Sequence, residues 1–284
     1  MVYKQQHNVA RRVGQAIRFL LALTITVIMI FPLFWMLSTS LKTEAEVMGS
    51  QLVFWPEKMR FENFTYVIEK VPFFRYMLNT AVVTAMQMAS ELLLGIMAAY
   101  AFSKGKFHGK HLLFLLVLGA MMIPLQVTFI PLYVMVAQAG MMSTYWGVWI
   151  AGCVSSYTIF LLRQAFMTVD NSYLEAAHVD GMGKFATLFR IMVPMCKPTV
   201  ITVALTAFMG GWNNYFWPKV IVKEQNMYLL TVGIQKLRTS YGGEVTNNYH
   251  QIMAGVLLSV IPVFIVFALF QRHMLSGFTK AAMK

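Results

Sequence analysis

Long stretches without charged residues divide this sequence into apolar segments with the length of a membrane-spanning helix. A helix needs about 20 apolar residues to cross about 30 Å of hydrocarbon. Five charge-poor stretches reach that length, and the one over residues 112–162 is long enough for two crossings with a break at residues 140–144. The pattern predicts six transmembrane helices, at residues 18–40, 76–102, 112–136, 144–166, 199–217 and 250–271.

The composition supports an all-α integral membrane protein. Of the 284 residues, 58% are hydrophobic and 12% are charged, against about 25% charged residues in an average soluble domain. So few charges could not cover the surface of a soluble globule, and the aromatic content excludes a disordered chain. The first apolar segment exceeds the roughly 7 to 15 residues of a signal-peptide core, so we expect a retained helix.

The distribution of charge predicts how the chain is oriented in the membrane. Six helices place both termini on one side, and the residues on that side, counted over 1–18, 103–111, 163–198 and 272–284, include 14 basic and three acidic ones, against nine and seven on the other side. The positive-inside rule makes the first side cytoplasmic. The net charge of +12 therefore needs no nucleic acid. The expected cytoplasmic segments are 1–17, a short loop at 103–111, 168–197 and the tail 272–284, and the extracytoplasmic loops are 41–75 and 218–249.

The loop at 168–197 contains a short segment that is apolar on most sides. Ser172 and Glu175 have the S-x-x-E spacing of a capping box, and Gly181 suits the left-handed position that ends a helix. A helix of about eight residues, about 12 Å long, is expected between them. Such a helix needs burial, either in a groove of another protein or against lipid headgroups.

The same loop carries a motif that resembles the EAA signature of permease subunits in binding-protein-dependent ABC importers. Five elements match in order and spacing: Glu175-Ala176-Ala177, Asp180, Gly181, Ile191 and Pro194. Further matches are typical of the carbohydrate-uptake branch, the maltose-importer type: Asn79-Thr80, residues 98–101, Met122-Ile123-Pro124, Trp212-Asn213-Asn214-Tyr215 before Pro218, and Gln271-Arg272 with the residues 277–284. Two departures are Asp170, where the family often has Pro, and the tail at 279–282.

The resemblance implies a type I ABC importer permease, in which a coupling helix between the fourth and fifth transmembrane helices docks on a separate ATPase. Glu175 would contact the ATPase or hold the helix start, Ala176 and Ala177 would pack in its groove, and Gly181 would turn the chain. The implied partners are a second permease subunit in a heterodimer, two ATP-binding cassette subunits, an extracytoplasmic sugar-binding protein and membrane lipid. The implied location is the bacterial cell membrane.

The chain itself shows no pattern for catalysis or for cofactor binding. Gly183-Lys184 is the nearest approach to a Walker A loop, and it lacks the first Gly and the Ser or Thr. ATP and Mg²⁺ are therefore expected on the partner subunit. No metal-ligand spacing or catalytic triad is visible, so we expect no metal site and no enzyme activity.

Five residues within the predicted helices are candidates for a transport pathway. Glu91 is the only acidic residue inside a predicted helix, and it either lines a pathway or is a protonated group bonded to a neighbouring helix. Trp212, Asn213, Asn214 and Tyr215 combine rings and amides suited to sugars, although interfacial anchoring and interhelical hydrogen bonds use the same residue types. A secondary, ion-coupled carrier is the alternative, but it should show inverted repeats and more intramembrane charges.

Overall fold

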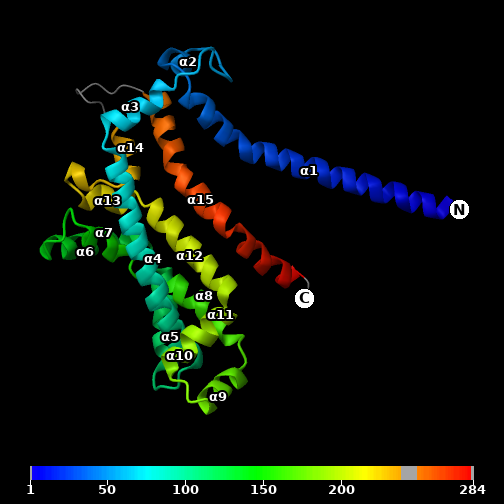
Figure 1. Cartoon of the computed structure of the whole chain (residues 1–284), viewed down its shortest axis with the longest axis vertical. Helices are drawn as coiled ribbons and strands as arrows, with labels where there is room; N and C mark the ends of the chain where they lie inside the picture. The colour runs from blue at the N-terminus through cyan, green and yellow to red at the C-terminus, as the bar shows by residue number, and fades with distance from the viewer. Residues whose placement is uncertain (1, 238–247, 283–284) are drawn as a thin grey trace. The chain divides into compact units, whose positions relative to one another are not determined.

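The computed structural model describes residues 2–237 and 248–282, and these residues contain helices and no strand (Figure 1). Residues 238–247 and 283–284 lie outside the described residues. The predicted segments 218–249 and 272–284 are therefore described only in part. The helices are α1 (Val2–Ser40), α2 (Glu44–Met48), α3 (Glu62–Lys70), α4 (Phe73–Lys104), α5 (Lys110–Met122), α6 (Leu125–Gln138), α7 (Tyr145–Trp149), η1 (Ile150–Gly152), α8 (Ser156–Met167), α9 (Asn171–Val179), α10 (Lys184–Thr187), η2 (Leu188–Met192), α11 (Val193–Met195), α12 (Lys197–Trp212), α13 (Phe216–Ile221), η3 (Gln225–Met227), α14 (Leu230–Lys236) and α15 (Tyr249–Ala282).

The number of helices that could cross a membrane agrees with the six predicted. By length and composition, three described helices qualify alone: Gly14–Ser40 within α1, the whole of α4, and Tyr249–Gln271 within α15. Three bent pairs raise the number to as many as six: α5 with α6, α7 and η1 with α8, and α10 to α11 with α12 to α13.

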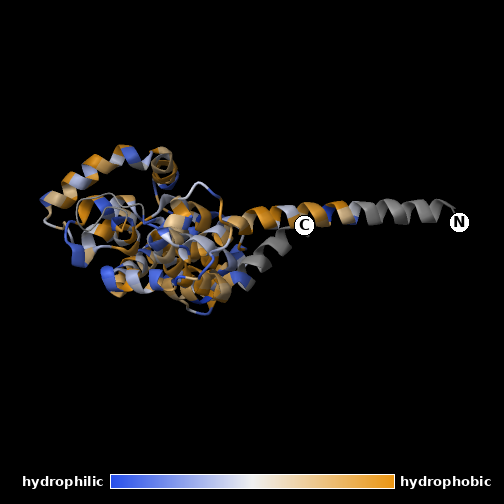
Figure 2. Ribbon diagram, turned by 90° about the horizontal axis from the view of Figure 1, so that it is seen from above, coloured by the Kyte–Doolittle hydropathy of each residue, from blue (hydrophilic) through white to orange (hydrophobic). Residues whose placement is uncertain are grey.

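The surface of α1 is that of a helix solvated by lipid. None of its most apolar stretch is buried, and large side chains such as Ile28 and Met29 are 65% and 71% exposed. Figure 2 shows the hydrophobic colour along much of the described part of this helix. A helix with such a surface satisfies its own backbone and leaves its side chains to hydrocarbon.

Three of the predicted transmembrane helices are interrupted in the structure. The helix predicted at 112–136 breaks before Pro124, because proline disfavours the helical conformation of the preceding residue, and Ile123 is extended with ψ 117°. The one predicted at 144–166 breaks between η1 and α8, and the one at 199–217 breaks between α12 and α13. The break predicted at residues 140–144 is confirmed, with left-handed Gly140 and Ser143.

The chain forms two compact units, of which the first comprises Met1–Val71 and Ile234–Leu258. In this unit the residues after α1 fold back on its end. The side-chain amide of Asn63 donates to the carbonyls of Ser40 and Lys42 at 2.8 and 2.9 Å, and the Lys42 ammonium lies 4.3 Å from the ring centroid of Trp35. Much of the predicted loop 41–75 is therefore ordered.

The second unit comprises Pro72–Gly233 and Ser259–Lys284, and α4 is its central helix. This helix begins at Phe73, three residues before the predicted start, and packs on α8 and α12. Two buried clusters fix its position. One contains Ile96, Ala99, Leu162, Phe166, Val169, Leu188, Met192, Cys196 and Val203, and the other contains Val83, Val136, Val148, Trp217, Ile221, Val222 and Leu229.

Candidate functional site: a polar cavity and the α9 helix

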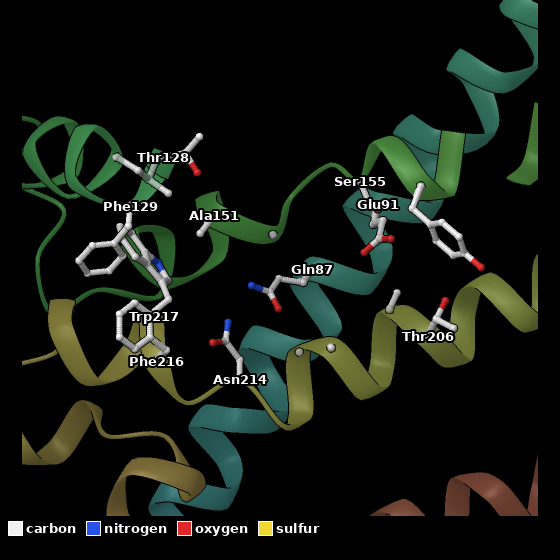
Figure 3. A pocket seen from close by; sticks show the side chains of 16 residues that line it. Gln87, Glu91, Thr128, Phe129, Ala151, Ser155, Thr206, Asn214, Phe216 and Trp217 are labelled. Atoms are coloured by element: carbon white, nitrogen blue, oxygen red, sulfur yellow. The ribbon is translucent and has the colours of Figure 1, made fainter. Parts of the chain in front are cut away.

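A cavity of about 340 Å³ lies inside the second unit, where α4 meets the three interrupted helices (Figure 3). The volume falls within the range of about 300 to 1,000 Å³ that is usual for small-molecule sites. Its lining residues are Gln87, Glu91, Thr128, Phe129, Leu132, Ala151, Gly152, Ser155, Tyr157, Thr206, Ala207, Gly210, Gly211, Asn214, Phe216 and Trp217. Two of the breaks border this cavity, the one between η1 and α8 through Ser155 and the one between α12 and α13 through Asn214.

Gln87 is held in a slot between two glycines. A Cβ at Gly152 would lie 2.7 Å from its Nε2 atom, and a Cβ at Gly211 would lie 2.9 Å from its Oε1 atom. The amide is 4% exposed, and Nε2 donates to the carbonyl of Val148 at 3.4 Å. In Figure 3 the Gln87 side chain extends toward that of Asn214. Two amides from α4 and from the end of α12 therefore face the same space.

Glu91 lies at the wall of the cavity and is bonded to a neighbouring helix. Its carboxyl group lines the cavity and also accepts a hydrogen bond from the hydroxyl of Thr158, which is fully buried on α8. Gly95, one turn further along α4, makes room for this contact, since a Cβ there would lie 2.6 Å from Cγ2 of Thr158. The hydrogen bond fixes the Glu91 carboxyl at the cavity wall.

Aromatic rings form another part of the wall. The Phe129 ring lies 4.8 Å from that of Phe216 and 5.8 Å, edge to face, from that of Trp217. The indole N–H of Trp217 donates to the carbonyl of Gly147 at 3.0 Å, so the ring is fixed. Figure 3 shows these three rings grouped together. Ring faces and edges contact apolar C–H groups, while the amides can bond hydroxyl groups.

The four residues of the Trp-Asn-Asn-Tyr motif separate, and among them only Asn214 lines the cavity. Trp212 stacks on Phe208 and donates its indole N–H to the carbonyl of Ser259 at 3.1 Å, on α15. Asn213 is exposed and bonds back to its own helix, and the Tyr215 ring lies under the Lys219 ammonium.

The short helix predicted in the 168–197 loop is α9, and its start differs from the expectation. The side chain of Asp170 accepts a hydrogen bond from the backbone N–H of Ser172 at 2.9 Å, so Asp170 is the N-cap. The predicted capping box of Ser172 with Glu175 was wrong, because Ser172 already lies inside the helix. The residue that departs from the family pattern thus supplies the cap.

The predicted end of α9 at Gly181 is confirmed. Gly181 has φ +74°, its N–H donates to the carbonyl of His178 at 3.0 Å, and the N–H of Met182 donates to that of Ala177 at 2.9 Å. This is the hydrogen-bond pattern of a Schellman motif. Asp180 is the C-cap residue.

The two sides of α9 have different surroundings. Ala177 is 1% exposed and Leu174 packs on the core of α4, α8 and η2, so Ala177 faces its own chain, although it was expected in a partner's groove. Glu175 and Ala176 are exposed, and Val179 is 86% exposed. Successive helical residues are 100° apart, so these three share one outer face.

Two hydrogen bonds hold the start of α9 to the end of α4. The Lys104 ammonium, at the end of α4, donates to the carbonyl of Val169 at 2.6 Å and to the side-chain oxygen of Asn171 at 2.8 Å. Beyond α9, the signature residue Ile191 is half-buried in the π-helical turn η2, and Pro194 is exposed in α11. The start of α9 is therefore tied directly to the end of α4.

The assigned N-cap can be tested by hydrogen exchange at a pH where the Asp170 carboxylate is charged. Hydrogen bonding from the Ser172 backbone holds the pKa of Asp170 below its ordinary value. A depressed folded pKa means that the cap's contribution is present above the unfolded value, about 3.9, and is lost as pH falls through the lower folded value. We expect Asp170→Ala to speed hydrogen exchange of the Ser172 amide at neutral pH, and Asp170→Asn to preserve its protection. Equal exchange in both variants would contradict the assigned cap.

The sequence alone also matches a known family. The model of the family described as "Binding-protein-dependent transport system inner membrane component" matches residues 91–280. The chain belongs to this family. It is therefore a multi-pass membrane permease, and neither the family nor its relatives support an ion-coupled carrier. Among the described residues, no group of three or more His, Cys, Asp or Glu is placed to hold a metal ion.

Two curated relatives share this membership, and one solved structure shares the fold. The chain is 30% identical to the arabinooligosaccharides transport system permease protein AraQ of Bacillus subtilis, covering 92% of each chain. It is 28% identical to the diacetylchitobiose uptake system permease protein NgcG of Streptomyces coelicolor, covering 91% of this chain and 85% of that one. A crystal structure of a bacterial ABC transporter that imports alginate matches with a TM-score of 0.80 at 23% identity, covering 92% and 96%. The fold is that of a type I ABC importer permease.

Proposed function

We propose that this chain is one of two permease subunits of an ATP-driven importer of oligosaccharides, and that α9 docks on a separate ATPase subunit. In this proposal ATP and Mg²⁺ bind to the ATPase, an extracytoplasmic binding protein delivers the sugar, and both termini lie in the cytoplasm of a bacterial cell. The printed functions of the relatives support a sugar substrate.

The outer face of α9 is the observation that carries the proposal. Val179 exposes 86% of its surface, on a helix whose opposite side is fixed against the core through Ala177 and Leu174. A helix that exposes a large apolar side chain on its outer face gains free energy when that side chain is buried in a groove of a partner. Its connection to α4 through Lys104 gives a route by which a movement of the partner reaches the cavity.

The cavity supports the sugar-binding part of the proposal. Gln87 and Asn214 supply donors and acceptors for hydroxyl groups, and Phe129 and Trp217 supply apolar ring surface. A sugar carries both kinds of surface. In the membrane, the cavity would receive the sugar when the helix breaks around it move relative to α4.

The turn after α9 provides an experiment on coupling. A Cβ at Gly181 would meet nothing within 4 Å, so only its left-handed backbone resists substitution. Asn tolerates this conformation, whereas a β-branched residue does not. We expect Gly181→Val to lower ATP-driven uptake in proteoliposomes by at least about fivefold while the complex still inserts, because αL costs an ordinary non-glycine residue about 1 to 2 kcal/mol. Gly181→Asn should keep uptake close to that of the wild type, because Asn adopts this conformation readily. Normal uptake by Gly181→Val would count against the proposal.

A further inference from the structure

A separate cavity, of about 830 Å³, opens at the end of α4 beside α9. It lies within the second unit and shares no lining residue with the polar cavity described above. Its lining residues are Met97, Tyr100, Ala101, Lys104, Gly105, Lys106, Phe107, Leu174, His178, Lys184, Phe185 and Leu188. No described residue among them is acidic.

The lining of this cavity is amphipathic. Met97, Ala101 and Leu188 supply apolar surface, while the exposed side chains of Lys106 and Lys184 supply positive charge. Met97 and Lys104 are seven residues apart on α4, which is about 10 Å along a helix. The cavity therefore passes from the apolar part of a transmembrane helix to its charged end, where the headgroups of a bilayer lie.

The cations near the cavity donate their hydrogen bonds to neutral oxygens, and the Asp170 carboxylate near Lys104 offsets only part of their charge. The Lys104 ammonium bonds a carbonyl and an amide oxygen. The ammonium of Lys110 donates to the carbonyls of Ser103 and Gly105 at 3.0 and 2.9 Å, and Nε of Arg163 donates to the carbonyl of Phe102 at 3.1 Å. The nearby carboxylate of Asp170 caps α9. An anion would gain from this excess of positive charge.

We propose that this cavity binds an anionic phospholipid, whose phosphate lies at Lys106 and Lys184 and whose acyl chain lies along Met97, Ala101 and Leu188. The positive charge of the lysines favours binding of an anion. The apolar lining of the cavity favours a lipid, which has an acyl chain, over free phosphate. Basic pockets between transmembrane helices are suited to such headgroups. The proposal requires only that the chain spans a membrane, so it stands independently of the transported substrate and of the ATPase.

The bound lipid would bridge α4 and α9. Leu174 and His178, one turn apart on α9, face the cavity, whereas Glu175, Ala176 and Val179 form the outer face. The lipid and a protein docked on that outer face therefore occupy different sides of the helix. Lipid composition would then influence how firmly α9 is held.

Native mass spectrometry of the purified transporter complex tests this directly. We expect the wild-type complex to retain phosphatidylglycerol in preference to phosphatidylcholine, and the double variant Lys106→Gln, Lys184→Gln to bind phosphatidylglycerol at least tenfold more weakly. The double variant Lys106→Arg, Lys184→Arg keeps the charge and should bind as the wild type does. The control is Lys219→Gln, Lys223→Gln, which neutralises two exposed lysines outside the cavity.

Three results would overturn the lipid site. One is equal retention of phosphatidylglycerol by the wild type and the glutamine variant. Another is equal retention of phosphatidylcholine and phosphatidylglycerol by the wild type. The last comes from thermal unfolding of the wild-type complex. If inorganic phosphate raised the midpoint temperature of unfolding as much as phosphatidylglycerol does, the site would bind a free anion and not a lipid. If the arginine variant also failed to bind, the phosphate contact assigned to these lysines would be wrong.

Discussion

Val179→Asp is expected to lower ATP-driven uptake by at least about tenfold without preventing insertion of the chain. Val179 is 86% exposed and contributes little to the chain's own core, so the variant should fold. Docking would bury an unpaired carboxylate, which costs several kcal/mol, and each 1.4 kcal/mol is a factor of about ten in affinity. Sugar uptake and ATP hydrolysis measured together in proteoliposomes would show both activities falling.

A matched control separates docking from an effect on folding. Val179→Thr nearly preserves the shape of the side chain and adds no charge, so we expect uptake close to that of the wild type. The amount of ATPase subunit that co-purifies with each variant reports docking itself. Wild-type uptake and normal co-purification for Val179→Asp would mean that the outer face of α9 contacts no partner.

Gln87→Leu and Asn214→Leu are expected to reduce uptake strongly while ATPase docking remains normal. Each change replaces an amide that faces the polar cavity with an apolar group of similar size. A sugar hydroxyl left without its partner costs about 1 to 3 kcal/mol, which corresponds to about fivefold to more than a hundredfold in affinity. Uptake at several sugar concentrations should show a raised KM for each variant.

The neighbouring amide supplies the control for this experiment. Asn213 is exposed, bonds to the Met209 carbonyl of its own helix and does not line the cavity. Asn213→Leu should therefore leave the KM for the sugar unchanged. If Asn213→Leu and Asn214→Leu had equal effects, the cavity would not be the sugar site.

Much of the fold follows from the sequence because membrane helices need long apolar runs. The six predicted segments match the helices and bent pairs of the structure, and Gly181 ends α9 as its conformational freedom predicts. Helix boundaries that depend on competition between neighbouring capping residues were harder to predict from the sequence. Asp170 and Ser172 can both cap a helix, and the choice of Asp170 places the start one residue after it.

The interruptions within the transmembrane helices were harder to predict. Pro131 lies inside α6 and Pro262 inside α15, whereas Pro124 separates α5 from α6. A proline alone therefore does not determine whether a helix breaks, because neighbouring groups can satisfy the freed carbonyls. The break at residues 213–215 contains no proline.

The cavity could be predicted only in part, because its residues come together through tertiary packing. Glu91 was noticeable as an acidic residue in an apolar segment, and Asn214 belonged to a recognisable motif. Gln87 gave only the weaker signal of one amide in an apolar helix. Its slot depends on Gly152 and Gly211, which are 59 residues apart in the sequence and lie in different helices. No local pattern connects them.

The most direct measurement is site-specific cross-linking from position 179 in the assembled transporter, after Cys153 and Cys196 have been replaced by Ala. With Val179→Cys, we expect a cross-link to the ATP-hydrolysing subunit whose yield changes when ATP binds. Lys223→Cys, at an exposed position in the segment that we assign to the opposite side of the membrane, should give none. A cross-link from position 223 and none from position 179 would contradict the proposed docking and orientation.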